Sequence, residues 1–268
     1  MKDYVLELVS RKSGYNDKLN TMREYLQAYV LRVMHDEGVF RSTAFLGGTA
    51  LRFLYDLPRF SEDLDFSSTG EQAFSFQSLL KKIISELSSA GYNVSVTYND
   101  KKIVNSAFIK FSDLMFEAGI SPLKSQKFSI KVDIDSNPPK GAVFTTQIVN
   151  KFFPISFLSF NVESLLAGKL HALVSRKYTK GRDYFDLGWY LSKWKGIEPN
   201  LILLKNSLKQ TGWKSDFPEK SNWRNLICGV VEKADWKKIK QDVESFLENP
   251  SDLDILTKEN ILHLLRNS

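Results

Sequence analysis

The chain of 268 residues has very little cysteine or histidine. Cys228 is its only cysteine, which excludes intramolecular disulfides and the thiolate clusters that hold structural zinc. The three histidines, His35, His171 and His263, are scattered and form no metal-binding pair at helical spacing. The chemistry of this chain must therefore rest on carboxylates, lysines and the backbone.

Long apolar runs are also missing. No segment approaches the ~20 residues that a membrane span needs, and residues 1–4 lack the basic-then-apolar pattern of a signal peptide. We therefore expect a soluble, cytoplasmic protein without a membrane partner. What the sequence does contain is a net charge of +6. This charge favours a polyanionic partner only weakly, because many solvated surfaces carry as much.

The most informative stretch begins where a short apolar strand ends at Gly47 and Gly48. Two glycines allow the backbone to turn tightly and to approach a ligand closely. Thr49 is expected to cap the short apolar helix that follows, so that amide N–H groups and a hydroxyl point at whatever lies over the turn. Such a turn attracts anions, and phosphate above all. Gly47, Gly48 and Thr49 are therefore candidate nucleotide-binding residues.

A pair of carboxylates follows this turn. Arg59 and Ser61, two further candidate nucleotide-binding residues, lead into Asp63 and Asp65, which strand alternation places on one face. Neighbouring carboxylates repel each other unless a cation lies between them, and hard oxygen ligands suit Mg²⁺, with Mn²⁺ also possible. Beside a phosphate-binding turn they indicate a nucleoside triphosphate and two-metal transfer chemistry. A glycine turn and an acidic surface strand would explain each half alone, but the two joined by one short helix favour the functional interpretation.

A third carboxylate is expected from residues 128–135, where apolar and polar residues alternate. Asp133 is our choice for the third metal ligand and for the group that accepts the proton of the attacking hydroxyl. Asp135, on the same predicted face, is the fallback. The solvated face of an edge strand remains an alternative for Lys131 and Asp135, and is less attractive for Asp133.

The run from Gly47 to Leu51, followed by Arg59-x-Ser61-x-Asp63-x-Asp65, resembles the first motif of the AbiEii/MenT nucleotidyltransferases. These are toxin components of bacterial abortive-infection, or type IV toxin–antitoxin, systems in the DNA polymerase β-like superfamily. Three further segments resemble the second, third and fourth motifs of the family: Lys131-x-Asp133, residues 163–173 with Arg176, and residues 182–187. The family often has a polar residue where Asp135 stands.

The resemblance implies roles that spacing alone does not give. It implies that Lys169 contacts nucleotide phosphate, with Arg59 as a second counter-charge, and that Asp186 belongs to the active site. Taken by themselves, Arg182 and Asp186 look like an ordinary solvent-exposed pair four residues apart on a helix. The resemblance also implies Mg²⁺-dependent transfer of a nucleoside monophosphate to an RNA acceptor at the tRNA 3′ end, growth inhibition as the outcome, and a cognate antitoxin as partner.

Three alternatives stay open at this point. A catalytically silent regulatory protein would bind NTP without transferring it. Nucleotidyl transfer to a protein hydroxyl would use the same site on another acceptor. A metal-dependent nuclease would also use paired carboxylates, but it needs neither the Gly-Gly-Thr turn nor Lys169.

The expected fold is α/β (α+β). A nucleotidyltransferase-type mixed sheet flanked by helices should occupy residues 1–160, and a helical domain over 161–268 should close the active-site cleft. Residues 1–14 look like a loose leader. Helices are predicted near 16–37, 71–90, 114–118, 201–210, 222–233, 235–248 and 257–266, and two more are expected to open at 161–164, with Asn161 as the cap, and at 182. Strands are predicted near 94–98, 103–111, 128–135, 145–149 and 155–160.

Overall fold

The computed structural model describes residues 1–70 and 75–267, and it contains two compact units. The first unit comprises Met1–Asp56, Phe60–Pro138 and Thr145–Ser159. The second comprises Leu57–Arg59, Pro139–Phe144 and the chain from Phe160 onward. Each is described by itself.

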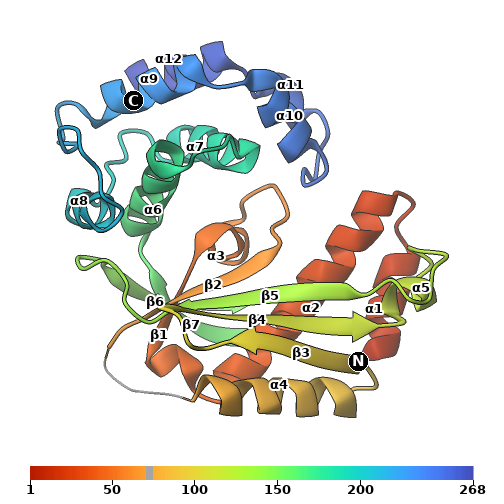
Figure 1. Cartoon of the computed structure of the whole chain (residues 1–268). Helices are drawn as coiled ribbons and strands as arrows, with labels where there is room; N and C mark the ends of the chain where they lie inside the picture. The colour runs from red at the N-terminus through yellow and green to blue at the C-terminus, as the bar shows by residue number, and fades with distance from the viewer. Residues whose placement is uncertain (71–74, 268) are drawn as a thin grey trace. The chain divides into compact units, whose positions relative to one another are not determined.

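The first unit is built on a mixed sheet whose strands follow the order β3-β4-β5-β2-β1-β7-β6 (Figure 1). Strand β2 lies between a parallel neighbour, β5, and an antiparallel neighbour, β1. The expected mixed sheet is thus confirmed. The strands are β1 Thr43–Leu46, β2 Asp63–Ser68, β3 Asn93–Asn99, β4 Val104–Ser112, β5 Phe128–Asp135, β6 Phe144–Asn150 and β7 Pro154–Phe160.

Alternation along β5 divides the sheet into an apolar and a polar face. Ile130, Val132 and Ile134 are buried, whereas Lys131 and Asp133 lie on the opposite, partly exposed face. Helices α2 (Tyr15–Asp36) and α4 (Phe76–Ser89) pack against the sheet and against each other. The predicted direction of the acidic side chains on β2 and β5 is therefore confirmed.

The expectation of a loose leader over residues 1–14 is wrong. Residues Lys2–Ser10 form helix α1, which packs on α2 (Figure 1). Val5 and Val9 are both 0% exposed, and this i, i+4 apolar pair provides the packing that holds the helix. Leu6 and Leu8 lie between the two valines, so apolar residues at helical spacing were present in the sequence and were overlooked.

Helix α4 starts at Phe76, because Ser75 caps it by accepting a hydrogen bond from the Ser78 N–H at 3.2 Å. The helix predicted over 71–90 is therefore confirmed from Phe76 onward, and its residues 71–74 lie outside the described part of the chain. The remaining helical elements of this unit are the 3₁₀ turn η1 (Val39–Arg41), α3 (Gly47–Tyr55) and α5 (Leu114–Glu117).

The second unit is helical. Asn161 caps its first helix as predicted, since its Oδ1 accepts a hydrogen bond from the Ser164 N–H at 3.0 Å. Gly181 is the first residue of α7. This position needs glycine because a Cβ there would lie 2.2 Å from the Ile239 carbonyl oxygen of α10. The helices are α6 Val162–Ser175, α7 Gly181–Lys193, α8 Leu201–Gln210, α9 Trp223–Lys233, α10 Trp236–Glu244, α11 Asp252–Ile255 and α12 Lys258–Asn267.

The predicted helices of this unit are confirmed, while the short α11 was not predicted. Across the described residues, none of the helices is both long enough and apolar enough to cross a membrane.

Candidate active site

The glycine turn closes directly onto a carboxylate. Gly47, the first residue of α3, has a φ of +81°, a left-handed conformation that favours glycine. A Cβ at this position would lie 2.3 Å from Oδ2 of Asp65. The turn therefore needs glycine both for its backbone and for its contact with Asp65. Because the first amides of a helix lack intrahelical acceptors, the start of α3 favours an anion close to Asp65.

Thr49 does not cap this helix, so that prediction is wrong. The helix begins two residues earlier, with Leu46 in the capping position, and the Thr49 side chain is buried. Its Oγ1 donates a hydrogen bond of 2.5 Å to the carbonyl of Asp63. The hydroxyl therefore ties α3 to the start of β2 instead of pointing at a ligand over the turn.

The segment that leads into β2 is held from α2. Nε2 of Gln27, which is buried, donates to the carbonyls of Ser61 at 3.1 Å and of Glu62 at 2.9 Å. Ser61 thus contributes a backbone contact that fixes the approach to Asp63.

The three predicted metal-binding carboxylates lie on two neighbouring strands. In the register of the parallel strands β2 and β5, Asp65 lies opposite Asp133 and Asp63 lies opposite Lys131. All four residues are on the same face and are partly exposed. The structure therefore brings Asp63, Asp65 and Asp133 together.

Lys131 is the positive charge among these carboxylates. Its Nζ donates a hydrogen bond to Oδ2 of Asp133. Burial works to lower the pKa of Lys131, but the hydrogen bond and charge of Asp133, together with the charges of Asp63 and Asp65, raise it above its usual value. One ammonium group thus binds Asp133 and is influenced by the charges of Asp63 and Asp65.

Asp135 has different surroundings. It lies opposite Ser67 of β2, one pleat beyond the pair formed by Asp65 and Asp133. Its Oδ1 accepts the backbone N–H of Asn137 at 2.9 Å and so closes the turn after β5. Register and hydrogen bonding both favour Asp133 over Asp135 as the third carboxylate.

Donor chemistry and burial indicate that these residues suit a divalent cation. In the described part of the chain, no three His, Cys, Asp or Glu side chains form a ready-made metal site, and Lys131 supplies the local positive charge. Oδ1 of Asp133, however, is buried and has no hydrogen-bond partner among the described residues. A buried carboxylate oxygen without a partner is costly, and hard oxygen donors are what Mg²⁺ and Mn²⁺ prefer.

A second charged cluster lies in the second unit and centres on Asp186 of α7. Arg59 binds this carboxylate in a bidentate manner, with Nε 2.6 Å from Oδ1 and Nη2 2.6 Å from Oδ2. Lys169 of α6 lies 2.6 Å from the same Oδ2 and 3.2 Å from Oδ1 of Asp183. Arg176 pairs with Asp183 at 3.1 Å. Lys169 and Asp186, predicted as partners, are thus in direct contact.

Burial distinguishes this cluster. Asp186 is 0% exposed and Arg59 is 2% exposed. Burial alone would raise the pKa of Asp186, but the charges of Arg59 and Lys169 lower it below its usual range. Burial likewise works to lower the pKa of Lys169, and Asp186 and Asp183 raise it. Carboxylate and cations are therefore held ionised together.

The interpretation of Arg182 and Asp186 as an exposed surface pair is wrong. Arg182 lies against α10, where its backbone N–H donates to Oδ2 of Asp242 at 3.1 Å. Its guanidinium lies 4.1 Å from the ring centroid of Phe246, just after that helix. Asp186 faces the interior because it shares a helical face with the buried Asp183, three residues earlier.

Positive charge gathers around the start of α7. Burial, with the nearby charges of Arg182 and Arg176, lowers the pKa of Lys180, the residue before the helix. Among the described residues, Asp183, Asp186 and Asp242 form ion pairs with Arg59, Lys169, Arg176 and Arg182, and Lys180 is a fifth cation close to them. Five cations against three carboxylates leave a surplus suited to an anion.

A family model described as the nucleotidyl transferase AbiEii toxin of type IV toxin–antitoxin systems matches residues 30–258. This chain belongs to the AbiEii family. It is a nucleotidyltransferase and a toxin of the type IV class, which implies a nucleotide as substrate and an antitoxin as partner. Nucleotidyltransferases of this kind generally use divalent metal ions. A search of curated proteins finds no match for this AbiEii-family chain.

Solved structures share the fold of this AbiEii-family protein at low identity. JHP933 from Helicobacter pylori is 17% identical with a TM-score of 0.53, and the match covers 92% of this chain and 90% of that one. MenT4, a nucleotidyltransferase toxin from Mycobacterium tuberculosis, is 13% identical with a TM-score of 0.57, and the match covers 100% of this chain and 90% of that one. At these identities the likeness concerns the fold alone.

The sequence placed Arg176 and Asp183 in segments that resemble family motifs but assigned them no role. Both complete the buried network around Lys169, and the helical spacing of Asp183 and Asp186 is the signal that could have assigned the first of them. The place of Arg59 was also missed, because nothing in the sequence shows that a loop residue before β2 belongs to the helical unit.

Proposed function

We propose that this AbiEii-family toxin transfers a nucleoside monophosphate from an NTP to the 3′-hydroxyl of an RNA, at the tRNA 3′ end, with Mg²⁺ as the metal and Mn²⁺ as a possible substitute. The observation that carries the proposal is the group of Asp63, Asp65 and Asp133 around a single ammonium, directly beside the turn at Gly47. Such a group combines a cation site with an anion site.

The carboxylates of the first unit have separate roles in this proposal. Asp63, Asp65 and Asp133 would hold the metal, which when bound activates a hydroxyl and neutralises the charge of the leaving pyrophosphate. Asp133 would also receive the proton of the attacking hydroxyl, because its buried Oδ1 lacks a partner among the described residues. Asp135 would keep its structural bond to Asn137.

Phosphate binding is assigned to backbone and to lysine. Gly47 and Gly48 would offer the amides at the start of α3, and Lys169 would contact a phosphate oxygen. Arg59, predicted as a second counter-charge, is engaged by both oxygens of Asp186. We therefore assign Arg59 and Asp186 to positioning Lys169. Thr49 and Ser61 would shape the turn through their bonds to the backbone of Asp63 and to Gln27.

The biological role follows from the family. A toxin that modified the tRNA 3′ end would stop translation and growth, and a cognate antitoxin would counter it. The net charge of +6 is compatible with an RNA acceptor. The domain division at residue 160, closure of the cleft by the helical part and the cytoplasmic location remain predictions.

The test is incubation with each α-³²P-labelled NTP, Mg²⁺ and total bacterial RNA, followed by a denaturing gel, with Asp63→Ala as the control. We expect label in a tRNA-sized band that is absent from the Asp63→Ala lane. Label that survives in Asp63→Ala would overturn the mechanism. A labelled protein band without labelled RNA would move the acceptor to a protein hydroxyl. NTP binding without any transfer would favour the silent regulatory alternative.

A further inference from the structure

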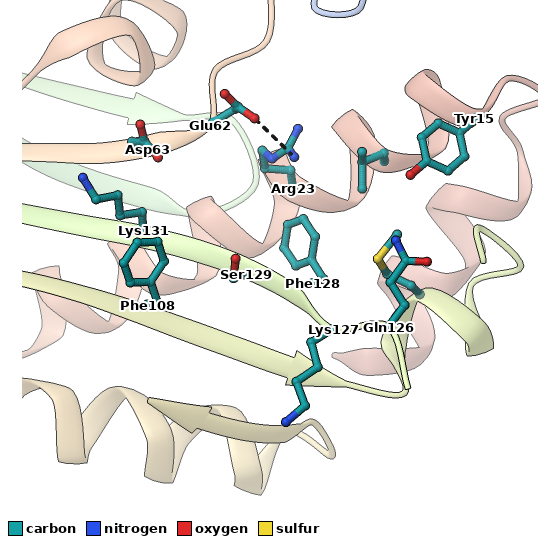
Figure 2. Close-up of a pocket in the computed structure, with 12 residues that line it drawn as sticks. Tyr15, Arg23, Glu62, Asp63, Phe108, Gln126, Lys127, Phe128, Ser129 and Lys131 are labelled. Atoms are coloured by element: carbon teal, nitrogen blue, oxygen red, sulfur yellow. Dashed lines mark ion pairs between the residues drawn. The ribbon is translucent and has the colours of Figure 1, made fainter. Parts of the chain in front are cut away.

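A polar cavity of about 310 Å³ lies in the first unit beside Asp63 of β2 and Lys131 of β5 (Figure 2). It is lined by the start of α2, the segment before β2, the middle of β4 and the start of β5, and its walls include Asp63 and Lys131. Its volume is at the lower end of sites that take small molecules, which run from about 300 to 1,000 Å³. The cavity therefore has room for about one nucleotide next to the carboxylates.

Two partly exposed aromatic rings lie at its two ends. Phe108 is 41% exposed and Tyr15 is 54% exposed, and Figure 2 shows Phe108 beside Lys131 and Tyr15 at the far end, on α2. Phe108 lies opposite Lys131 in the β4–β5 register and so shares the polar face of the sheet with the carboxylates. Exposed rings of this kind stack on the bases of single-stranded nucleic acids, whatever their sequence.

A cation lies between the two rings. The guanidinium of Arg23 is 5.6 Å from the ring centroid of Phe128 and 3.8 Å from a carboxylate oxygen of Glu62. In Figure 2 Arg23 occupies the middle of the labelled group, whereas the ammonium of Lys127 points away from it. Two exposed rings provide stacking surfaces for bases, and an arginine between them provides positive charge for a phosphate.

The strand order places the cavity and the glycine turn on opposite sides of β2. The glycine turn follows β1, which flanks β2 on one side, whereas the cavity is built on β5 and β4, which flank β2 on the other. In an in-line displacement the attacking oxygen and the leaving group lie on opposite sides of the reacting phosphorus. If the triphosphate lies at the glycine turn, the acceptor hydroxyl lies on the cavity side.

We infer that this cavity binds the 3′-terminal nucleotide of a single-stranded RNA acceptor, with Phe108 stacking on the last base, Tyr15 on a preceding base and Arg23 facing the backbone between them. The inference rests on the proposed function and identifies its acceptor subsite. The transferred phosphorus forms a bond to the acceptor 3′-oxygen and loses its bond to pyrophosphate, and the hydroxyl proton passes to Asp133.

Two measurements on the full chain test the inference. The first is the fluorescence anisotropy of a short 5′-fluorescein single-stranded RNA ending in ACCA, titrated with protein in the absence of NTP. The second is the pair of KM values for RNA and for NTP in the transfer reaction. Phe108→Leu removes the ring but keeps apolar bulk, and Phe108→Tyr restores the ring. Tyr98→Ala is the matched control: it is 46% exposed on the neighbouring strand and lies on the opposite face.

We expect Phe108→Leu to weaken RNA binding roughly tenfold, within the range measured for base–aromatic stacking, and to raise the KM for RNA while the KM for NTP stays unchanged. Phe108→Tyr should restore both values, Tyr15→Ala should show a smaller loss, and Tyr98→Ala should match the unaltered chain.

Unchanged RNA binding in Phe108→Leu and Tyr15→Ala would overturn the inference, and with normal labelling it would leave the proposed function standing. A raised KM for NTP alone would also overturn it, because the cavity would then hold the donor. If the unaltered chain labels no acceptor, the proposed function fails, and loss of RNA binding in Phe108→Leu would still support the cavity as an RNA site.

Discussion

The carboxylates of the two units have opposite surroundings. In the first unit Asp63, Asp65 and Asp133 are partly exposed and act together on the ammonium of Lys131. In the second, Asp186 is fully buried and bound by two cations at 2.6 Å. A group with too little positive charge is stabilised by a cationic ligand, whereas a buried, fully paired group is stabilised by the fold itself. Acidic residues in the family-like motifs thus have two different roles: those of the first unit are suited to binding a cation, and Asp186 stabilises a buried charge cluster.

The largest expected effect breaks the buried cluster. Asp186→Ala removes the carboxylate that binds the buried Arg59 and leaves Lys169 with Asp183. We therefore expect a loss of about 3–5 kcal/mol in the free energy of unfolding, measured by urea denaturation. Asp63→Ala is the matched control and should change this free energy by less than about 1 kcal/mol, since it relieves repulsion at a partly exposed site. Equal losses in both variants would contradict the comparison.

A smaller effect is expected at the glycine turn. Gly47→Ala introduces a left-handed alanine, costing about 1–2 kcal/mol, and a Cβ that displaces the Asp65 carboxylate. We expect nucleotidyl transfer to fall about 10²-fold, because a small misplacement of a catalytic group is costly. Gly70→Ala separates the two causes, since Gly70 has a φ of +79° but a Cβ added there would meet no atom of the described residues within 4 Å. It should lose stability but keep activity.

A metal-binding measurement tests whether the positive charge of Lys131 competes with a divalent cation for the three carboxylates. Lys131→Met removes the positive charge beside the three carboxylates, so we expect Mn²⁺ to bind about fivefold more tightly, as for about 1 kcal/mol of charge repulsion in water-like surroundings, in calorimetric titrations without NTP. Lys110→Met is the control, because Lys110 lies on the same face of β4 but opposite Ser129. Weaker binding in Lys131→Met would show that the lysine supports the metal site.

The smallest effect concerns pH and the second unit. Burial, with the nearby Arg176, lowers the pKa of His171, whose Nε2 lies 3.0 Å from Oγ1 of Thr211. The unfolded chain then takes up a proton first, so stability is fully present above about pH 6.5 and falls as the pH drops through the folded-state pKa. His171→Gln should reduce the decrease in melting temperature between pH 7 and pH 5.5 by no more than about 2 °C. A steeper decrease would contradict this sign.

Local patterns predicted the fold well and the charge pairing less well. The alternation of β5 placed Asp133 on the polar face, and the capping residue Asn161 located the start of α6. Each of these signals depends only on residues that are close together in the sequence. The partners of Asp186 could not be predicted in this way. Arg59 is 127 positions away in sequence, and a contact over that distance depends on how the whole unit folds.

The errors have physical causes of the same kind. Threonine is a residue type that often caps helices, which is why Thr49 was predicted as a cap. Gly47, however, can adopt the conformation that starts the helix two residues earlier. Val5 and Val9 pack on α2, a surface that residues 1–14 do not show by themselves. Phe108 looks like an ordinary strand residue until the register places it opposite Lys131.

The tripeptide Leu57–Arg59 limits how this chain can be divided. It stands between α3 and β2 of the first unit yet belongs to the second, as does Pro139–Phe144 between β5 and β6. The backbone therefore passes between the units five times, at 56/57, 59/60, 138/139, 144/145 and 159/160. A fragment that starts at Phe160 lacks Arg59 and would leave the buried carboxylate of Asp186 without its bidentate partner, although Lys169 remains beside it. A single crossover at residue 160 would therefore separate Arg59 from Asp186.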